Sequence, residues 1–164
     1  MIDVPAEGQV TVEFTVNGVH HSVETSPRML LADLLRDRLG LTGINLGCEH
    51  GYCGACTILV NGESVRSCLM LAASADGAEI TTVEGLSRNG ELNPLQQSFQ
   101  EAHGLQCGFC TPGMLLTATE LLEGTEGPLE EDQIREAISG NICRCTGYVF
   151  IVDAIRRASE RRDA

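Results

Sequence analysis

Four cysteines in the first half of the chain have a spacing that could hold iron. Cys48, Cys53 and Cys56 follow the pattern C-x4-C-x2-C, and Cys68 comes after eleven further residues. Four thiolates at this plant-type spacing ligate the two irons of a [2Fe–2S] cluster. The spacing therefore predicts a [2Fe–2S] site on these four residues.

The glycines of the same loop suit this chemistry. Gly51 and Gly54 lie between the cysteines. A loop that wraps a cluster needs positive φ values and a close approach of the backbone to sulfur, and glycine permits both. Backbone N–H groups aimed at the thiolates also spread the negative charge of a cluster.

A second set of four cysteines lies in the other half of the chain. Cys107 and Cys110 form a C-x2-C pair, and Cys143 and Cys145 form a C-x-C pair. Residues two apart do not share a face of a helix, so Cys143 and Cys145 are expected in a turn. The two pairs predict a second metal site.

Helix-start signals follow both pairs directly. Thr111-Pro112 comes after Cys110, and Thr146-Gly147 comes after Cys145. Threonine is a favoured N-cap and proline favours the first helical position. Two helix N-termini, with their positive ends directed at one place, would stabilise thiolates and an anionic cluster there.

Eight cysteines could also form disulfides, bind zinc or carry out thiol redox chemistry. A secreted disulfide framework is disfavoured, because residues 1–8 have neither a basic nor an apolar signal region. A cytoplasmic chain would keep its thiols reduced. The second set of four cysteines could instead bind a structural zinc ion. The thirty-two residues between its two pairs are, however, more than the spacing found in most zinc ribbons. A thioredoxin-like C-x2-C would need a βαβ context that the sequence lacks.

Composition excludes some classes of function. The 164 residues carry a formal net charge of −12, which argues against nucleic acid because phosphate affinity comes from Lys and Arg. No stretch is apolar for long enough to span a membrane. With 43% hydrophobic residues, the chain can form a buried core.

The first half predicts a small mixed sheet. Alternating Val10–Val16, then Asn17-Gly18 and Val19–Glu24, indicate a β-hairpin. A helix is expected over Pro27–Leu39, a second hairpin over 57–66 and a short strand over Glu79–Val83. Two hairpins and one helix correspond to a β-grasp domain over residues 1–85.

The second half predicts helices only. Residues 86–93 are polar and contain glycine, as expected for a linker, and residues 94–164 form the second domain. Helical patterns cover 94–103, 112–122, 130–139 and 147–162. The two cysteine segments look like copies of one helix–loop–helix unit, so we expect a four-helix second domain with pseudo-two-fold symmetry. The whole chain is then expected to be α+β, with a plant-type ferredoxin-like β-grasp domain first.

These motifs together resemble one family. Residues 48–57 (CEHGYCGACT), 67–68 (SC), 106–113 (QCGFCTPG) and 141–148 (NICRCTGY) are similar to the iron–sulfur subunit of molybdenum hydroxylases, the xanthine oxidase family. The likeness is nearest to the small subunit of its three-subunit bacterial members, of the carbon monoxide dehydrogenase type. It spans nearly the whole chain and displaces the zinc interpretation.

The resemblance implies two [2Fe–2S] clusters and two partner subunits. One cluster would lie on Cys48, Cys53, Cys56 and Cys68, and the other on Cys107, Cys110, Cys143 and Cys145. Gln106 and Cys145 would approach the molybdopterin of a large subunit, whereas the first cluster would face a medium subunit with FAD.

The chain would then relay electrons, without catalysing a reaction alone, in a cytoplasmic dimer of heterotrimers. The alternative is a stand-alone two-cluster electron carrier. The resemblance further implies that the large subunit, and not this chain, selects the substrate.

Overall fold

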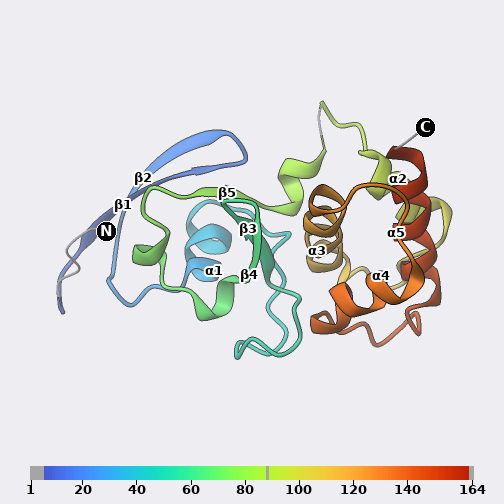
Figure 1. Ribbon diagram of the computed structural model, residues 1–164. Helices are drawn as coiled ribbons and strands as arrows, with labels where there is room; N and C mark the ends of the chain where they lie inside the picture. The colour runs from blue at the N-terminus through green and yellow to red at the C-terminus, as the bar shows by residue number, and fades with distance from the viewer. Residues whose placement is uncertain (1–5, 88, 163–164) are drawn as a thin grey trace.

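The computed structural model describes residues 6–87 and 89–162. Its first half contains one sheet, and its second half consists of helices joined by loops (Figure 1). The fold is therefore mixed α+β, as predicted. Among the described residues, no helix is both long and apolar enough to cross a bilayer.

The sheet has five strands in the order β2-β1-β5-β3-β4. Their bounds are β1 Val10–Val16, β2 Val19–Thr25, β3 Thr57–Val60, β4 Glu63–Arg66 and β5 Glu79–Thr81. The pairs β1–β2, β3–β4 and β3–β5 are antiparallel, and β1 pairs with β5 in parallel. The short β5 thus joins the two hairpins into one sheet.

Both hairpin turns form where the sequence predicts them. Asn17-Gly18 and Asn61-Gly62 all have positive φ, at 51°, 80°, 53° and 86°. Two-residue turns of this kind match the right-handed twist of the flanking strands, and asparagine followed by glycine tolerates the left-handed region best.

The predicted helix over Pro27–Leu39 is wrong in its first part. Leu30 has extended backbone (φ −73°, ψ 144°) and forms a β-bridge with Leu71. Flanking hydrogen bonds hold it there, from Leu31 N to Met70 O (2.7 Å) and from Ala72 N to Met29 O (2.8 Å). Because pairing with a distant segment takes these backbone groups, the helix begins only at Leu31, as α1 Leu31–Asp33 and the π-helical η1 Leu34–Arg38.

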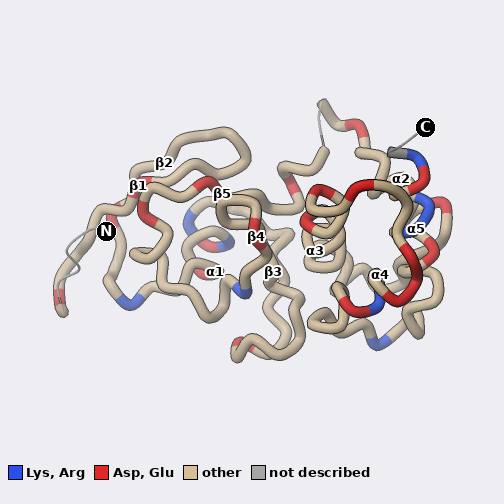
Figure 2. The backbone as a smooth tube through the Cα atoms, in the orientation of Figure 1, with Lys and Arg blue, Asp and Glu red and all other residues tan. Residues whose placement is uncertain are grey.

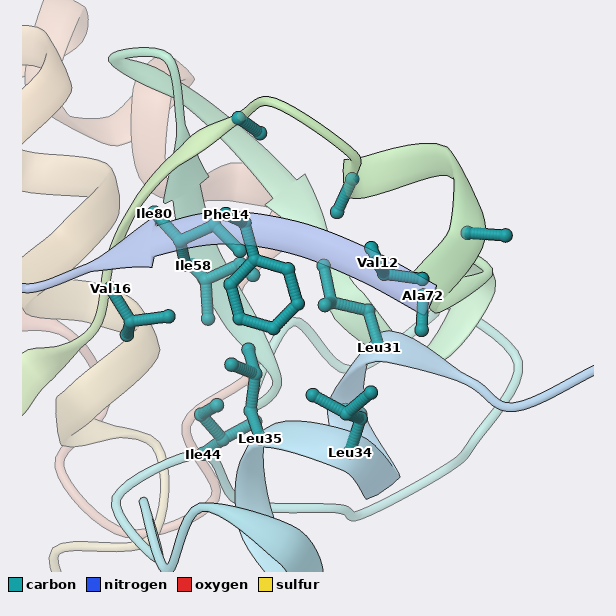
Figure 3. Packing of buried hydrophobic residues seen from close by; sticks show 14 of the residues in the cluster. Val12, Phe14, Val16, Leu31, Leu34, Leu35, Ile44, Ile58, Ala72 and Ile80 are labelled. Atoms are coloured by element: carbon teal, nitrogen blue, oxygen red, sulfur yellow. The ribbon is translucent and has the colours of Figure 1, made fainter. Parts of the chain in front are cut away.

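This helical segment covers one face of the sheet. Phe14 of β1 points toward Leu31, Leu34 and Leu35, and Ile58 and Ile80 from the neighbouring strands lie beside it (Figure 3). The alternation of buried and exposed residues along β1 produces this arrangement, since every second side chain faces the helix.

The second half begins with helix α2 at Pro94, as predicted. The helices are α2 Pro94–Glu101, α3 Thr111–Gly124, α4 Glu131–Ala137 and α5 Val149–Arg162. Short 3₁₀ turns add η2 Ser67–Leu69, η3 Ala72–Ala75, η4 Val83–Leu86 and η5 Ile138–Gly140. A second hydrophobic cluster, with Phe99, Met114 and Ile155 among its members, joins these helices. Helix α3 lies nearest the sheet and contacts β3 and β4 (Figure 1).

A capping box starts α2, and we predict a modest loss of stability when it is removed. Asn93 Oδ1 accepts a hydrogen bond from Gln96 N (2.8 Å), and Gln96 Oε1 accepts one from Asn93 N (2.9 Å). Asn93→Ala should lower the free energy of unfolding by about 1 kcal/mol, because the backbone N–H of Gln96 loses its side-chain acceptor. Chemical denaturation measures the change, and Gln100→Ala on the exposed face of α2 is the control; equal stabilities for the two variants would contradict the prediction.

Candidate metal centres

The β3–β4 hairpin brings the first four cysteines together. Cys56 directly precedes β3, and Cys68 lies in η2, directly after β4. Ser67 is fixed opposite Cys56, because its Oγ donates to Cys56 O at 2.7 Å and its N donates to the same oxygen at 3.3 Å. The hairpin therefore places the fourth cysteine beside the third, as the sequence predicts. Cys56 and Cys68 are 2% and 3% exposed.

The rest of this loop folds through left-handed backbone. Glu49, Gly51 and Gly54 have φ of 55°, 79° and 72°. The bends direct backbone N–H groups toward sulfur: Cys53 N donates to Cys48 Sγ at 3.3 Å. The loop thus surrounds its thiols with donors, which is the arrangement that an anionic cluster requires.

The thiols of this first site differ in electrostatic environment. Backbone N–H groups of His50 and Cys53 lower the pKa of Cys48 to about 6. Burial, followed by the hydrogen bond with the Cys56 thiol, raises the pKa of Cys68 to about 11. A metal must therefore displace a proton at Cys68, whereas Cys48 is already a good thiolate at neutral pH.

The second four cysteines come from two loops between helices. Cys107 and Cys110 lie between α2 and α3, and Cys143 and Cys145 lie between η5 and α5. Cys107 and Cys145 are exposed with their sulfurs 3.5 Å apart, whereas Cys110 and Cys143 are 9% and 8% exposed. The C-x-C pair lies in a non-helical turn, which confirms that prediction.

Helix α3 begins immediately after Cys110, but α5 begins later than predicted. Gly147 and Tyr148 have φ of 66° and 70°, so the helix cannot start before Val149. Thr146 is therefore not an N-cap. Its Oγ1 lies 3.2 Å from Cys143 Sγ, and its N donates to that sulfur at 3.5 Å. Thr111 is likewise inside α3, with Cys110 at the cap position.

The four thiols of the second site also differ in the direction of their pKa shifts. Burial, and then the Cys143 thiol, raise the pKa of Cys110 to about 12. Burial acts in the same direction on Cys143, but hydrogen bonds from the Thr146 hydroxyl and N–H, the Cys145 N–H and the Cys110 thiol together outweigh burial and lower the pKa of Cys143. The Phe109 backbone N–H lowers the pKa of Cys107, and the hydrogen bond with Cys107 raises that of Cys145.

The eight thiols contact one another in pairs. Within residues 6–87 and 89–162, no three His, Cys, Asp or Glu side chains converge as they would on a single ion. The pairs are Cys48 with Cys53, Cys56 with Cys68, Cys107 with Cys145 and Cys110 with Cys143. Two pairs at each site fit a cluster of two irons, because each iron takes two thiolates.

The two cysteine loops also contact each other, which the sequence did not indicate. Ile142 N donates to Cys53 O at 2.8 Å, and Asn45 Nδ2 donates to Phe109 O at 2.8 Å. Contacts between residues so far apart in the chain leave no local pattern. The nearest signal in the sequence is Gly140-Asn141 before Cys143, a small residue and an amide where the loops meet.

Gln106 lies in the loop just before Cys107 and is exposed, as is Cys145. Several apolar side chains close in sequence to the second four cysteines are exposed: Leu105, Phe109, Ile142, Val149 and Phe150. Near the first site Tyr52, Leu69 and Leu71 are exposed. Along the described backbone, acidic residues occur in both halves and basic residues are fewer; α5 carries several of them, where Arg156 and Arg157 pair with Asp153, and Arg161 pairs with Glu101 (Figure 2).

Known families match both halves. Residues 14–86 match the 2Fe-2S iron-sulfur cluster binding domain, and residues 82–156 match the [2Fe-2S] binding domain. The chain is thus an iron–sulfur protein with two [2Fe–2S] domains.

Comparison with similar proteins shows which class of iron–sulfur protein this chain is. The chain is 54% identical over 155 residues to the 6-hydroxypseudooxynicotine dehydrogenase complex subunit beta of Paenarthrobacter nicotinovorans, covering 94% of this chain and 96% of that one. It is 54% identical over 150 residues to caffeine dehydrogenase subunit gamma of a Pseudomonas species, covering 90% of each. The solved structure of quinoline 2-oxidoreductase from Pseudomonas putida 86 superposes with a TM-score of 0.90 at 51% identity, over 94% of this chain and 97% of that one. The chain belongs to the family of small iron–sulfur subunits of molybdenum hydroxylases.

Proposed function

We propose that this chain relays single electrons from the molybdenum centre of a large subunit to FAD in a medium subunit. Electrons would enter at the site of Cys107, Cys110, Cys143 and Cys145 and leave from the site of Cys48, Cys53, Cys56 and Cys68. Each [2Fe–2S] cluster, when bound, accepts and gives up one electron. The observation that carries the proposal is the pair of four-thiol sites joined by the Ile142–Cys53 backbone hydrogen bond.

The thiol pairs suggest how each site divides its ligands. Cys48 and Cys53 would hold one iron of the first site, and Cys56 and Cys68 the other. In the second site the exposed pair, Cys107 and Cys145, would hold the outer iron. The buried pair, Cys110 and Cys143, would hold the inner one.

The proposed domains are residues 1–85, the linker 86–93 and residues 94–164. We assign a plant-type β-grasp fold to the first domain and a pseudo-two-fold four-helix arrangement to the second. The pseudo-two-fold arrangement is supported by the matching ends of α2 and α4. In each helix the glutamine at the third position, Gln96 or Gln133, accepts a hydrogen bond from the N-cap backbone N–H at 2.9 Å. Both C-caps have φ −84° and ψ 1°. A cysteine loop and a 14-residue helix then follow each.

Two surfaces suit the two partners. Gln106 and Cys145 are exposed, as are the apolar residues Leu105, Ile142 and Val149 near them in the sequence, and we assign this surface to the molybdopterin of the large subunit. The surface with Tyr52 and Leu69 at the first site would contact the FAD subunit. Uncovered apolar side chains around a redox site favour stable contact with other subunits over a free carrier. We place the complex, a dimer of heterotrimers, in the cytoplasm.

Native purification and iron analysis test this function. The chain should co-elute with a large and a medium subunit, molybdenum and FAD, and should contain about four iron atoms from two two-iron sites. Recovery of a lone coloured monomer with about four irons would instead identify a stand-alone carrier. About two irons, or stoichiometric zinc, would refute the two-site assignment.

A further inference from the structure

Asn141 is a buried polar residue at the junction of the two cysteine loops. It is 1% exposed, although an amide side chain is costly to bury unless its groups are hydrogen-bonded. It lies two residues before Cys143, a proposed iron ligand, and one residue before Ile142, whose N–H reaches Cys53 O. Its position therefore affects both sites.

The hydrogen bonds of Asn141 join the two halves of the chain. Its Nδ2 donates to Gly54 O at 3.0 Å and to Thr57 Oγ1 at 3.3 Å, both in the first half. Its Oδ1 accepts from Thr117 Oγ1 of α3 at 3.0 Å. The amide thus uses its donor side on the first cysteine loop and its acceptor side on its own half.

Arg66 strengthens the same contact from the sheet. Its guanidinium donates to Thr57 Oγ1 at 2.7 Å and to Gly140 O at 2.8 Å. Arg66 thereby holds the residue before Asn141, while Thr57, directly after Cys56, receives bonds from both side chains. The network therefore links β3, β4 and α3 to the segment just before Cys143.

Close packing leaves this junction little freedom. A Cβ on Gly54 would lie 2.4 Å from Gly140 O, and a Cβ on Gly113 would lie 2.4 Å from Gly54 O. Backbone segments from the two halves therefore meet with no side chain between them. An amide that bonds to both sides at such a place determines how the loops are aligned.

We propose that Asn141 is a positioning residue that fixes the second cysteine loop against the first and so sets the separation of the two metal sites. The proposal rests on the proposed relay, because electron transfer between two sites falls off exponentially with their separation. Without the amide, the Ile142–Cys53 hydrogen bond would lose its neighbouring anchor, and the loops would separate transiently while each site kept its own four thiols.

The test compares Asn141→Ala with wild type in the full chain after reconstitution with iron and sulfide. Both proteins should bind about four irons and show two reduced-cluster electron paramagnetic resonance signals, because no ligand is changed. In Asn141→Ala the magnetic splitting of each signal by the other cluster should decrease. Hydrogen exchange at the Ile142 amide should become about tenfold faster, because losing a buried hydrogen bond opens the contact more often.

Ser159→Ala is the matched control. Ser159 is equally buried, and its hydroxyl accepts from Leu129 N at 3.1 Å and donates to Arg156 O, but it is in α5 and bonds to neither cysteine loop. It should lower stability and leave the splitting unchanged. If Ser159→Ala changed the splitting and Ile142 exchange as Asn141→Ala does, the effect would be one of general stability and the proposal would be overturned.

A second variant keeps the proposal testable if Asn141→Ala does not fold. Arg66→Met removes the guanidinium bonds from a half-buried site and should change both readouts in the same direction, by less. Wild-type splitting and wild-type exchange in either foldable variant would overturn the positioning role. If wild type itself lacked one cluster, the proposed relay would fail, and exchange at Ile142 would still decide whether Asn141 holds the loops together.

Discussion

Cys110→Ser should abolish one of the two reduced-cluster electron paramagnetic resonance signals and stop electron flow through the assembled complex. Cys110 is 9% exposed, and its thiol contacts that of Cys143. A serine hydroxyl is a poor substitute because iron–sulfur clusters are held by thiolates. Turnover with an acceptor that takes its electrons from FAD should fall by about 10³-fold, which corresponds to about 4 kcal/mol added to the activation barrier at about 1.36 kcal/mol per tenfold change in rate.

The reciprocal variant is the control for this result. Cys56→Ser, at a site with 2% exposure in the first half, should remove the other signal and leave that of the second site. Iron content should fall from about four to about two in each variant, since each site holds two irons. Survival of both signals in Cys110→Ser would mean that the second site is wrongly assigned.

Local structure could be predicted where neighbouring residues determine it. The two Asn-Gly turns have the positive φ values that their sequence implies, and the strands beside them follow. The start of α2 at Pro94 follows from the Asn93–Gln96 pair, which is only three residues apart. The spacing of Cys48, Cys53 and Cys56 supports a ligand prediction for the same reason, because these residues are close in sequence, whereas the second set joins two pairs with thirty-two residues between them.

Structure that depends on distant segments could not be predicted. Leu30 is extended because Leu71 pairs with it, and nothing near Leu30 in sequence competes with a helix there. The late start of α5 depends on Tyr148, whose hydroxyl accepts from Cys143 N at 2.9 Å and whose φ is positive. The contact between the cysteine loops likewise joins residues 87 positions apart, as in the bond from Asn141 to Gly54.

Gly54→Ala should destabilise the chain strongly and loosen both sites at once. Gly54 has φ of 72°, which costs an L-residue about 1–2 kcal/mol. The added Cβ would also lie 2.4 Å from Gly140 O and 2.9 Å from Asn141 Cα, and these are backbone atoms that cannot rotate away. Overpacking of this kind adds about 1–3 kcal/mol. Thermal unfolding should show a lower Tm, with iron lost from both sites below the transition.

Gly62→Ala separates the cost of a positive φ from the cost of the steric clash. Gly62 has φ of 86°, and a Cβ there would meet nothing within 4 Å, so this variant has only the backbone cost. The difference between the two variants therefore measures the contact between the cysteine loops, and each 1 kcal/mol should appear as about 2–4 °C in Tm for a chain of this size. An equal drop in Tm for both variants would mean that the contact between the cysteine loops adds no stability. The two halves of the chain would then be held together by other contacts, such as those of α3 with β3.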